Sequence, residues 1–406
     1  MPGSKDAKNA GNGHNLKAFV RSRTGAVRDR LSGGRISALE QRLERTRKRL
    51  KKSHRRLENK DQEIAALRER LELASRATDA PVFFVVGQAK SGTGWLMKML
   101  NAHPEVLCGG EGKFFGQGWD DEKEWMSREP DSWYQGGALY GAMTHSGPIK
   151  YWMERPSFWS RKGGPEDRLN SMAGAAVKHF LRARLVKTDK RMVGDKTPLP
   201  GPDTVREISA AIPEARIIHI IRDGRDQAVS WMHHKWKGAQ DMGGRTQLTP
   251  EELAKRDDFF RTRSVPLEVD GGGIFTEDRL RTVASYWRDR VGTTVTDGSA
   301  LFGDRYVEVR YEDLLDRPVE EIRRLFGFLG ADDDEEVARR CVEAYDFETL
   351  SGRKRGNEEY EMGFQKRRKG IAGDWKNVFT ERDKVIYKEI AGGLLIELGY
   401  ADDNDW

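Results

Sequence analysis

Residues Pro81-Val-Phe-Phe-Val-Val-Gly-Gln-Ala-Lys-Ser-Gly-Thr-Gly-Trp95 decide the fold of this chain. The apolar, β-branched run predicts a buried strand over Val82–Val86, and a helical pattern begins near Trp95. The Gly-rich loop between them predicts a phosphate cradle, because loop N–H groups and the positive end of a helix dipole bind an anion without a particular side chain. The plainer alternative is a tight turn whose glycines serve steric needs only.

The loop differs from the nucleoside-triphosphate loop, which reads Gly, four residues, Gly, Lys and then Ser or Thr. Gly87 and Gly92 have that spacing, but Thr93-Gly94 occupy the Lys-Ser positions and the lysine, Lys90, lies inside the loop. The hydroxyl that would follow the lysine and bind Mg²⁺ is therefore missing. This pattern argues against metal-bound ATP or GTP as the ligand.

Composition limits the class of protein. The 406 residues, 37% of them hydrophobic, suffice for one large domain or two ordinary ones. With only Cys108 and Cys341, no disulfide framework is expected, which fits a reducing compartment. No apolar run of about 18 residues and no signal-peptide core is present, so we expect a soluble, cytoplasmic protein.

The N-terminal region is strongly basic and divides in two. The net charge is +11 over residues 1–80 and −5 over the rest. Residues 1–34 predict a disordered basic tail, and 35–76 predict a coiled coil and hence a homo-oligomer, from the heptad stripe Ile36, Leu43, Leu50, Leu57, Ile64 and Leu71. A lone charged helix is the alternative. The basic faces allow peripheral contact with an anionic membrane; a nucleic-acid partner is not expected, because such runs are usually solvated.

The remaining residues, 81–406, predict a second domain of α/β class. Strands alternate with long helical or mixed stretches, which argues for a parallel sheet with helices on both faces. The strands are expected at Val82–Val86, Glu105–Cys108, Arg191–Val193, Arg216–Ile221 and Arg305–Arg310. Trp119–Trp159, with many aromatic residues, looks like a pocket wall, and the polar Gly238–Gly273 looks like an insertion or lid; ordinary surface cover is the equal alternative for both.

Two further segments carry anion-binding signals. Arg216-Ile-Ile-His-Ile-Ile-Arg-Asp-Gly-Arg-Asp-Gln-Ala-Val-Ser230 predicts a buried strand that ends in Arg222 and leads to a helix with Ser230. Arg supplies a planar fork for phosphate, and Ser adds a neutral donor. In Arg367-Arg-Lys-Gly-Ile-Ala-Gly-Asp-Trp-Lys376, a basic triplet closed by glycines suits one anion. No histidine has metal-ligand spacing, so no metal site is predicted.

Together and in this order, the three segments resemble the sulfotransferases that use 3′-phosphoadenosine 5′-phosphosulfate (PAPS). Lys90–Trp95 resembles that family's 5′-phosphosulfate loop, Ile221–Ser230 its 3′-phosphate segment, and Arg368–Asn377 the C-terminal cofactor motif of its cytosolic branch. The resemblance implies a three-layer sheet like that of the P-loop NTPases, PAPS as sulfuryl donor and no metal. The cofactor-binding residues that it implies are Lys90, Ser91, Gly92, Thr93, Gly94 and Trp95, which would stack on adenine, with Arg222, Ser230, Arg368, Lys369 and Gly370.

The region of the catalytic base departs from the cytosolic branch. That branch has a Lys-Thr-His-Leu-Pro segment, whereas this chain reads Lys196-Thr-Pro-Leu-Pro200, so Pro198 replaces the histidine base. Gly110-Glu-Gly-Lys-Phe-Phe115 is instead similar to the carbohydrate sulfotransferases, which implies Glu111 as the base. Lys90 and Lys196 would stabilise charge on the transferred group. A small-molecule, glycan or glycolipid acceptor is expected, with glycan or glycolipid favoured.

Two other functions stay open at this point. A P-loop nucleotide kinase or other NTPase would share the sheet, the loop and the arginines, but would need Mg²⁺. A non-catalytic coiled-coil adaptor would use the basic helix for binding and keep the globular domain as a retired enzyme.

Overall fold

The computed structural model describes residues 27, 30, 33–116, 138–153, 164–241, 248–262, 273–346, 348–349, 354–355 and 370–406. Nearly all of the predicted tail 1–34 lies outside these ranges, as do Arg368, Lys369, most of Trp119–Trp159 and part of Gly238–Gly273. The chain divides into two compact units, residues 1–72 and 73–406.

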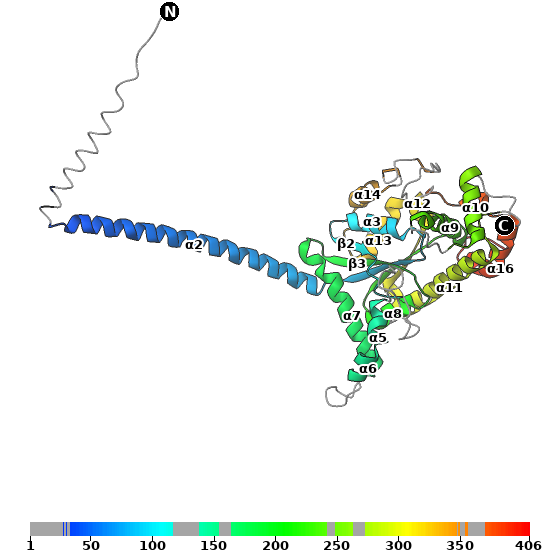
Figure 1. The fold of residues 1–406 in the computed structure, drawn as a ribbon, viewed down its shortest axis with the longest axis horizontal. Coiled ribbons are helices and arrows are strands. Elements are labelled where there is room, and N and C mark those ends of the chain that lie inside the picture. Colours follow the sequence, from blue (N-terminus) through cyan, green and yellow to red (C-terminus); the bar gives the residue numbers. More distant parts are fainter. Residues whose placement is uncertain are drawn as a thin grey trace, which may run out of the picture. The chain divides into compact units, whose positions relative to one another are not determined.

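Most of the first unit is a single long helix, α2, which spans Arg35–Thr78 (Figure 1). It covers the predicted coil at 35–76. The apolar heptad residues lie on its surface, with Leu50 and Leu71 69% and 71% exposed. A stripe of this kind is what a second helix would cover in a coiled coil. The pairing of α2 with another copy stays a prediction. None of the helices in the described ranges is both long and apolar enough to span a membrane.

The second unit is built on a five-stranded sheet, and all five predicted strands are confirmed. They are β1 (Val82–Gly87), β2 (Val106–Gly110), β3 (Met192–Pro198), β4 (Arg216–Ile221) and β5 (Tyr306–Arg310). The strand order is β2-β3-β1-β4-β5, and every neighbouring pair is parallel. Strand β3 continues to Pro198, past its predicted end at Val193, and so includes Asp195 and Lys196.

Alternate side chains of β1 enter different cores, which confirms helices on both faces. Phe83 and Val85 pack in one cluster with α3 (Thr93–Ala102), α13 (Pro318–Leu329) and α14 (Glu335–Glu343). On the other face, Val82, Phe84 and Val86 pack in a cluster with α7 (Pro165–Ala183) and α8 (Thr204–Ala211). Figure 1 shows α7 and α8 on the opposite side of the sheet from α3, α13 and α14. Residues of one strand that alternate in this way belong to opposite faces of a sheet. The fold is therefore the expected three-layer α/β arrangement.

A third cluster lies beyond the end of β4. It joins four helices through large buried rings, including Trp236, Trp287 and Tyr387. These helices are α9 (Gly224–Asp241), α10 (Pro250–Thr262), α11 (Glu277–Phe302) and α16 (Glu381–Glu397). The remaining elements are α5 (Leu139–Thr144), α6 (Gly147–Met153), α12 (Tyr311–Asp316) and short 3-10 helices at Leu185–Lys187, Gly303–Arg305 and Asp374–Asn377.

The topology determines where a ligand can meet several segments at once. Strand β1 lies between β3 and β4, so the chain leaves β1 at the point where the strand order reverses. In open parallel sheets, ligands bind outside the carboxyl ends of the strands at such a point. The predicted site segments follow or end β2, β3, β1 and β4, which are four neighbouring strands.

Candidate active site

The loop after β1 has the backbone of an anion cradle. Lys90 has φ 77° and Gly92 φ 94°, and Gly92 caps the start of α3. A Cβ at Gly92 would lie 2.6 Å from the Tyr311 ring, and one at Gly87 would lie 2.5 Å from the Ile220 carbonyl oxygen. At both positions a larger residue would clash, so glycine is required there for steric reasons. A Cβ at Gly94 would meet no described atom within 4 Å, so this residue of the first turn of α3 faces open space.

A donor that directly follows β4 and a donor on α9 bind two carbonyl groups of this loop. Gln227 Nε2 donates to the Ala89 carbonyl oxygen at 2.6 Å, and Arg222 Nη1 donates to that of Lys90 at 3.1 Å. The N–H groups of Ser91 and Trp95 donate to the carbonyl oxygens of Gln88 and Gly92 at 3.0 and 2.9 Å. The N–H groups of Gly92–Gly94, at the start of α3, are therefore the ones placed to bind an anion, because the first N–H groups of a helix lack partners one turn back.

Arg222 joins all three predicted anion-binding segments. Besides its bond to Lys90, its Nη2 donates to the Ile371 carbonyl oxygen at 3.4 Å, although Ile371 is 149 residues away in sequence. The guanidinium lies 4.4 Å from the centre of the Tyr311 ring. Trp287 Nε1 donates to the Arg222 carbonyl oxygen at 3.1 Å, which fixes the backbone at the end of β4.

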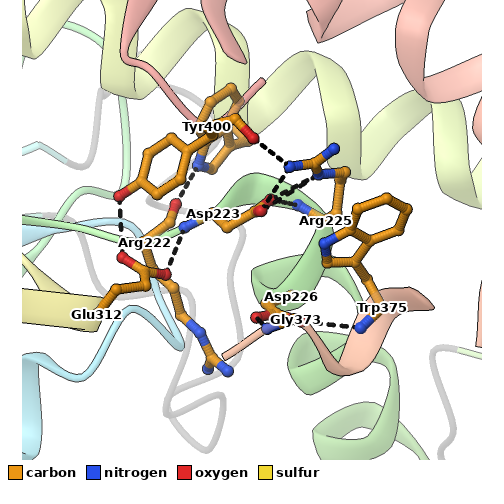
Figure 2. Close-up of polar contacts among 9 residues, drawn as sticks. Arg222, Asp223, Arg225, Asp226, Glu312, Gly373, Trp375 and Tyr400 are labelled. Atoms are coloured by element: carbon orange, nitrogen blue, oxygen red, sulfur yellow. Dashed lines mark hydrogen bonds and ion pairs between the residues drawn. The ribbon is translucent and has the colours of Figure 1, made fainter. Parts of the chain in front are cut away.

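The start of α9 holds the C-terminal motif by a buried carboxylate. Asp226 Oδ2 accepts the N–H of Gly373 at 2.7 Å, and Oδ1 accepts that of Trp375 at 2.9 Å (Figure 2). Burial raises the pKa of Asp226, an effect that the nearby Arg222 charge opposes. The other acidic residue in this turn, Asp223, pairs with Arg225 at 2.8 Å.

Arg225, the cation of this ion pair, also stacks on the C-terminal motif. Its guanidinium carbon lies 4.0 Å from the centre of the Trp375 ring and 4.3 Å from that of Trp406. It also donates to the Tyr400 carbonyl oxygen at 2.7 Å, and Figure 2 shows this group reaching Tyr400 while Glu312 accepts from the Tyr400 hydroxyl at 3.1 Å. Stacked and hydrogen-bonded guanidinium groups are well ordered, so this cluster is a rigid support.

The second half of the candidate site lies at the ends of β2 and β3. Lys196 Nζ donates to Glu111 Oε1, and the lysine side chain is only 12% exposed whereas that of Glu111 is 46% exposed. The two residues proposed from sequence as base and charge stabiliser are thus in contact. The open side of Glu111 leaves its carboxylate accessible to a second molecule.

Asp195 fixes the backbone that carries Glu111. It is 1% exposed, and it accepts the N–H of Gly112 at 3.1 Å and the hydroxyl of Thr197 at 2.9 Å. Burial raises the pKa of Asp195 to about 6, against the lowering effects of these bonds and of the charges on Arg184 and Lys196. Farther along, Phe114 and Phe115 are buried and anchor the segment in the core.

Comparison of the sequence with protein-family models decides the family. The family model described as the sulfotransferase domain matches residues 80–398. The chain belongs to this sulfotransferase family.

Individual relatives are more distant. Sulfotransferase 1B1 of Canis lupus familiaris is 26% identical over 195 residues, which cover 45% of this chain and 56% of that protein. A flavonol sulfotransferase-like protein of Flaveria bidentis is 31% identical over 128 residues, or 28% of this chain and 41% of the relative. The chain therefore spans about half the length of the curated relatives it matches.

Among solved structures, mouse sulfotransferase SULT7A1 complexed with PAP has a TM-score of 0.41 and 16% sequence identity, covering 81% of this chain and 92% of that one. Sulfotransferase STF9 from Mycobacterium avium has a TM-score of 0.40 and 13% identity, covering 79% of each chain.

The other residues expected from the sulfotransferase motifs are placed as follows. Trp95 is held by a bond from its Nε1 to the Tyr345 carbonyl oxygen at 2.7 Å and lies edge-on to Tyr311. Ser230 lies on α9 one turn after Asp226 and is partly exposed. Gly370 has φ 66°, and the preceding residues Arg368 and Lys369 are outside the described ranges.

Sequence reasoning missed four residues that shape the candidate site: Asp195, Asp226, Gln227 and Tyr311. Two of them, Asp226 and Gln227, lie inside the segment Arg216–Ser230 already singled out by motif, but nothing in a linear motif separates a positioning residue from a ligand-binding one. Tyr311, the first residue of α12, packs on Arg222 and lies against Gly92, so the start of α12 also shapes the site. Among the described residues, no group of three or more metal-ligating side chains occurs.

Proposed function

We propose that this protein transfers a sulfuryl group from PAPS to a hydroxyl or amine acceptor. The observation that carries the proposal is Arg222, whose two terminal nitrogens bond to the loop after β1 and to the C-terminal motif. A nucleotide with phosphates at both its 5′ and 3′ positions needs these segments to be adjacent. Family membership over residues 80–398 supports the same assignment.

The residues present fit such a ligand. Ser91 Oγ and Arg222 Nε are buried and have no hydrogen-bond partner among the described residues. Buried donors of this kind cost free energy unless something accepts from them, and phosphate oxygens would do so. Lys90 and the N–H groups of Gly92–Gly94 would bind the 5′ end, because those of Ser91 and Trp95 donate to the Gln88 and Gly92 carbonyl oxygens at 3.0 and 2.9 Å. Arg222 and Ser230, together with Arg368, Lys369 and Gly370, would hold the 3′-phosphate.

The chemistry follows from the arrangement of charges. PAPS, when bound, supplies an activated sulfuryl group. Glu111 accepts the proton of the acceptor hydroxyl or amine, a role that general-base catalysis makes worth ~10²–10⁴ in rate. Lys196 holds the Glu111 carboxylate in place by direct contact. Lys90 and the loop amides offset the negative charge that develops during transfer, as preorganised donors do in related phosphoryl chemistry.

For the acceptor, we favour a glycan or glycolipid. Two observations support this class: the segments around Glu111 and Lys196 are similar to the carbohydrate-modifying branch, and Trp119–Trp159 is rich in aromatic residues that could stack on sugar rings. A screen of glycan, glycolipid and phenolic acceptors with labelled PAPS, read by mass spectrometry, tests it. Transfer to a phenol with none to any sugar would overturn this choice.

The first experiment is calorimetric titration with 3′-phosphoadenosine 5′-phosphate (PAP) and, in parallel, with ATP. Each titration is run with EDTA and with Mg²⁺ on the wild type and on Arg222→Ala. We expect tight PAP binding that does not depend on metal and that the substitution weakens. No PAP binding alongside Mg²⁺-dependent ATP binding would place the protein among the NTPases instead.

We also infer that the protein is a homo-oligomer through α2. The exposed heptad residues support this, because burying a leucine stripe against a second copy is favourable. Light scattering of the full chain should show a multiple of 46.2 kDa, and Leu50→Glu with Leu57→Glu should return it to one copy. A wild-type monomer would contradict the proposal.

A further inference from the structure

Two consecutive side chains at the start of α9 hold two different segments of the site. Asp226 accepts the N–H groups of Gly373 and Trp375 at 2.7 and 2.9 Å, one on each carboxylate oxygen. Gln227 donates to the Ala89 carbonyl oxygen at 2.6 Å. Both side chains are almost fully buried, with 1% and 0% of their surface exposed. Neither residue lies in a position that sequence motifs assign to the ligand.

The segment that Asp226 holds is the continuation of the basic triplet. Gly370 and Gly373 both have positive φ, 66° and 77°, a backbone conformation that glycine adopts readily but other residues rarely do. Between these glycines, the Ile371 carbonyl oxygen accepts from Arg222 Nη2 at 3.4 Å. By fixing Gly373 and Trp375, Asp226 positions the preceding Ile371, whose carbonyl oxygen meets Arg222.

The loop that Gln227 holds is proposed to bind the other end of the ligand, the 5′ end. Ala89 precedes Lys90 in the loop after β1, where the 5′ end of the nucleotide is proposed to bind. The two contacts are therefore separable: one side chain supports each end. Figure 2 shows the Asp226 contacts with Gly373 and Trp375 on the side of the cluster away from Glu312 and Tyr400.

We propose that Asp226 is a positioning residue that sets the preference of this site for nucleotides with a 3′-phosphate, by holding the Gly370–Trp375 segment against Arg222. The inference rests on the proposed function and extends it. Asp226 acts through the backbone of other residues and is not a catalytic residue. Loss of the Asp226 carboxylate should weaken the binding of a ligand that carries a 3′-phosphate and leave the binding of a ligand without one unchanged.

The test uses two substitutions in the full chain and two ligands. Asp226→Asn keeps the shape of the side chain but turns an amide NH₂ toward one of two N–H donors, so one bond is lost and replaced by donor–donor repulsion. Gln227→Met removes the bond to the Ala89 carbonyl oxygen at similar volume and serves as the matched control. Affinities for PAP and for adenosine 5′-monophosphate are measured by calorimetry, and folding is followed by circular dichroism and thermal unfolding.

We expect Asp226→Asn to weaken the affinity for PAP at least 10-fold and that for adenosine 5′-monophosphate less than 3-fold. Gln227→Met should weaken the affinities for both ligands to the same extent. Equal losses for both ligands in Asp226→Asn would overturn the inference and leave the proposed function standing. If the wild type does not bind PAP, the proposed function fails instead. Should Asp226→Asn not fold, Asp226→Glu retains the charge on a longer stem and must show the same selective loss.

Discussion

Arg222→Lys tests whether the fork of the arginine, and not its charge alone, forms the site. The guanidinium places Nη1 on the Lys90 carbonyl oxygen at 3.1 Å and Nη2 on that of Ile371 at 3.4 Å, so one side chain links two segments. A lysine ammonium is a single point of charge on a flexible stem. It can reach one of these carbonyl groups, or a phosphate, but it cannot reproduce the planar link between both segments.

The expected size follows from the bonds that are lost. A hydrogen bond from a charged donor contributes about 1.5–3 kcal/mol net. The bond to Ile371 is close to the maximum length of a hydrogen bond and contributes little. The expected loss of binding free energy is therefore that of one good hydrogen bond, either to the Lys90 carbonyl oxygen or to the phosphate. At about 1.4 kcal/mol per decade, the dissociation constant for PAP should rise ~10–100-fold in Arg222→Lys. Arg222→Ala also removes the charge and should lose more.

The assay is calorimetric titration with PAP at 25 °C and fixed low salt, with thermal unfolding in parallel. Arg317→Lys is the matched control, because Arg317 is 52% exposed and pairs only with Asp313 and Glu320 of its neighbouring turns, among the described residues. This control should bind like the wild type. If Arg222→Lys is folded and binds PAP within threefold of the wild type, the reasoning that the fork joins the two segments is refuted.

Three further predictions concern the base, the buried carboxylate and the loop. Glu111→Gln should lower kcat ~10²–10⁴-fold on an acceptor found by the screen and leave PAP affinity unchanged; near wild-type turnover would remove Glu111 as the base. Because burial raises the pKa of Asp195 from 3.8 to about 6, the native state binds more protons than the unfolded state between these values. The free energy of unfolding should therefore fall as pH rises through that window, by about 3 kcal/mol from this group, and urea unfolding of Asp195→Asn at pH 4 to 7 should lack this component; identical slopes in both proteins would contradict it. Gly92→Ala should cost about 1–3 kcal/mol in urea unfolding, since φ is 94° at this position and the new Cβ would lie 2.6 Å from the Tyr311 ring. Gly94→Ala, in the first turn of α3 with open space for a Cβ, should be neutral or stabilise by up to about 1 kcal/mol; equal costs at the two positions would argue against the steric account.

The strands were predictable because of how parallel sheets are buried. Every residue of β1 is buried, and a strand covered on both faces reads as a continuous apolar run. The end of β3 was wrong because Asp195 and Lys196 are polar and break that run, although both are in the strand. Sequence alone cannot show that a charged residue is stabilised in the interior by specific partners.

The candidate site was only partly predictable for a different reason. The motifs that form it were found separately, since each has its own local composition. Their meeting depends on contacts between residues such as Asp226 and Trp375, which are 149 positions apart. No local pattern specifies such a pair, and the roles of Asp226 and Gln227 emerge only when the strand order brings the segments together.

The contact between Asp226 and the Gly373–Trp375 backbone also orders events during folding. The last strand of the sheet ends at Arg310, so a growing chain can complete all five strands well before Gly373 is synthesised. Until then, the buried carboxylate has neither of the backbone donors that it accepts from in the finished protein. Contacts this distant in sequence close late, because the entropy of the intervening loop must be lost first. A nascent chain would therefore hold a finished sheet and an unfinished candidate site until the segment around Gly373 has been synthesised.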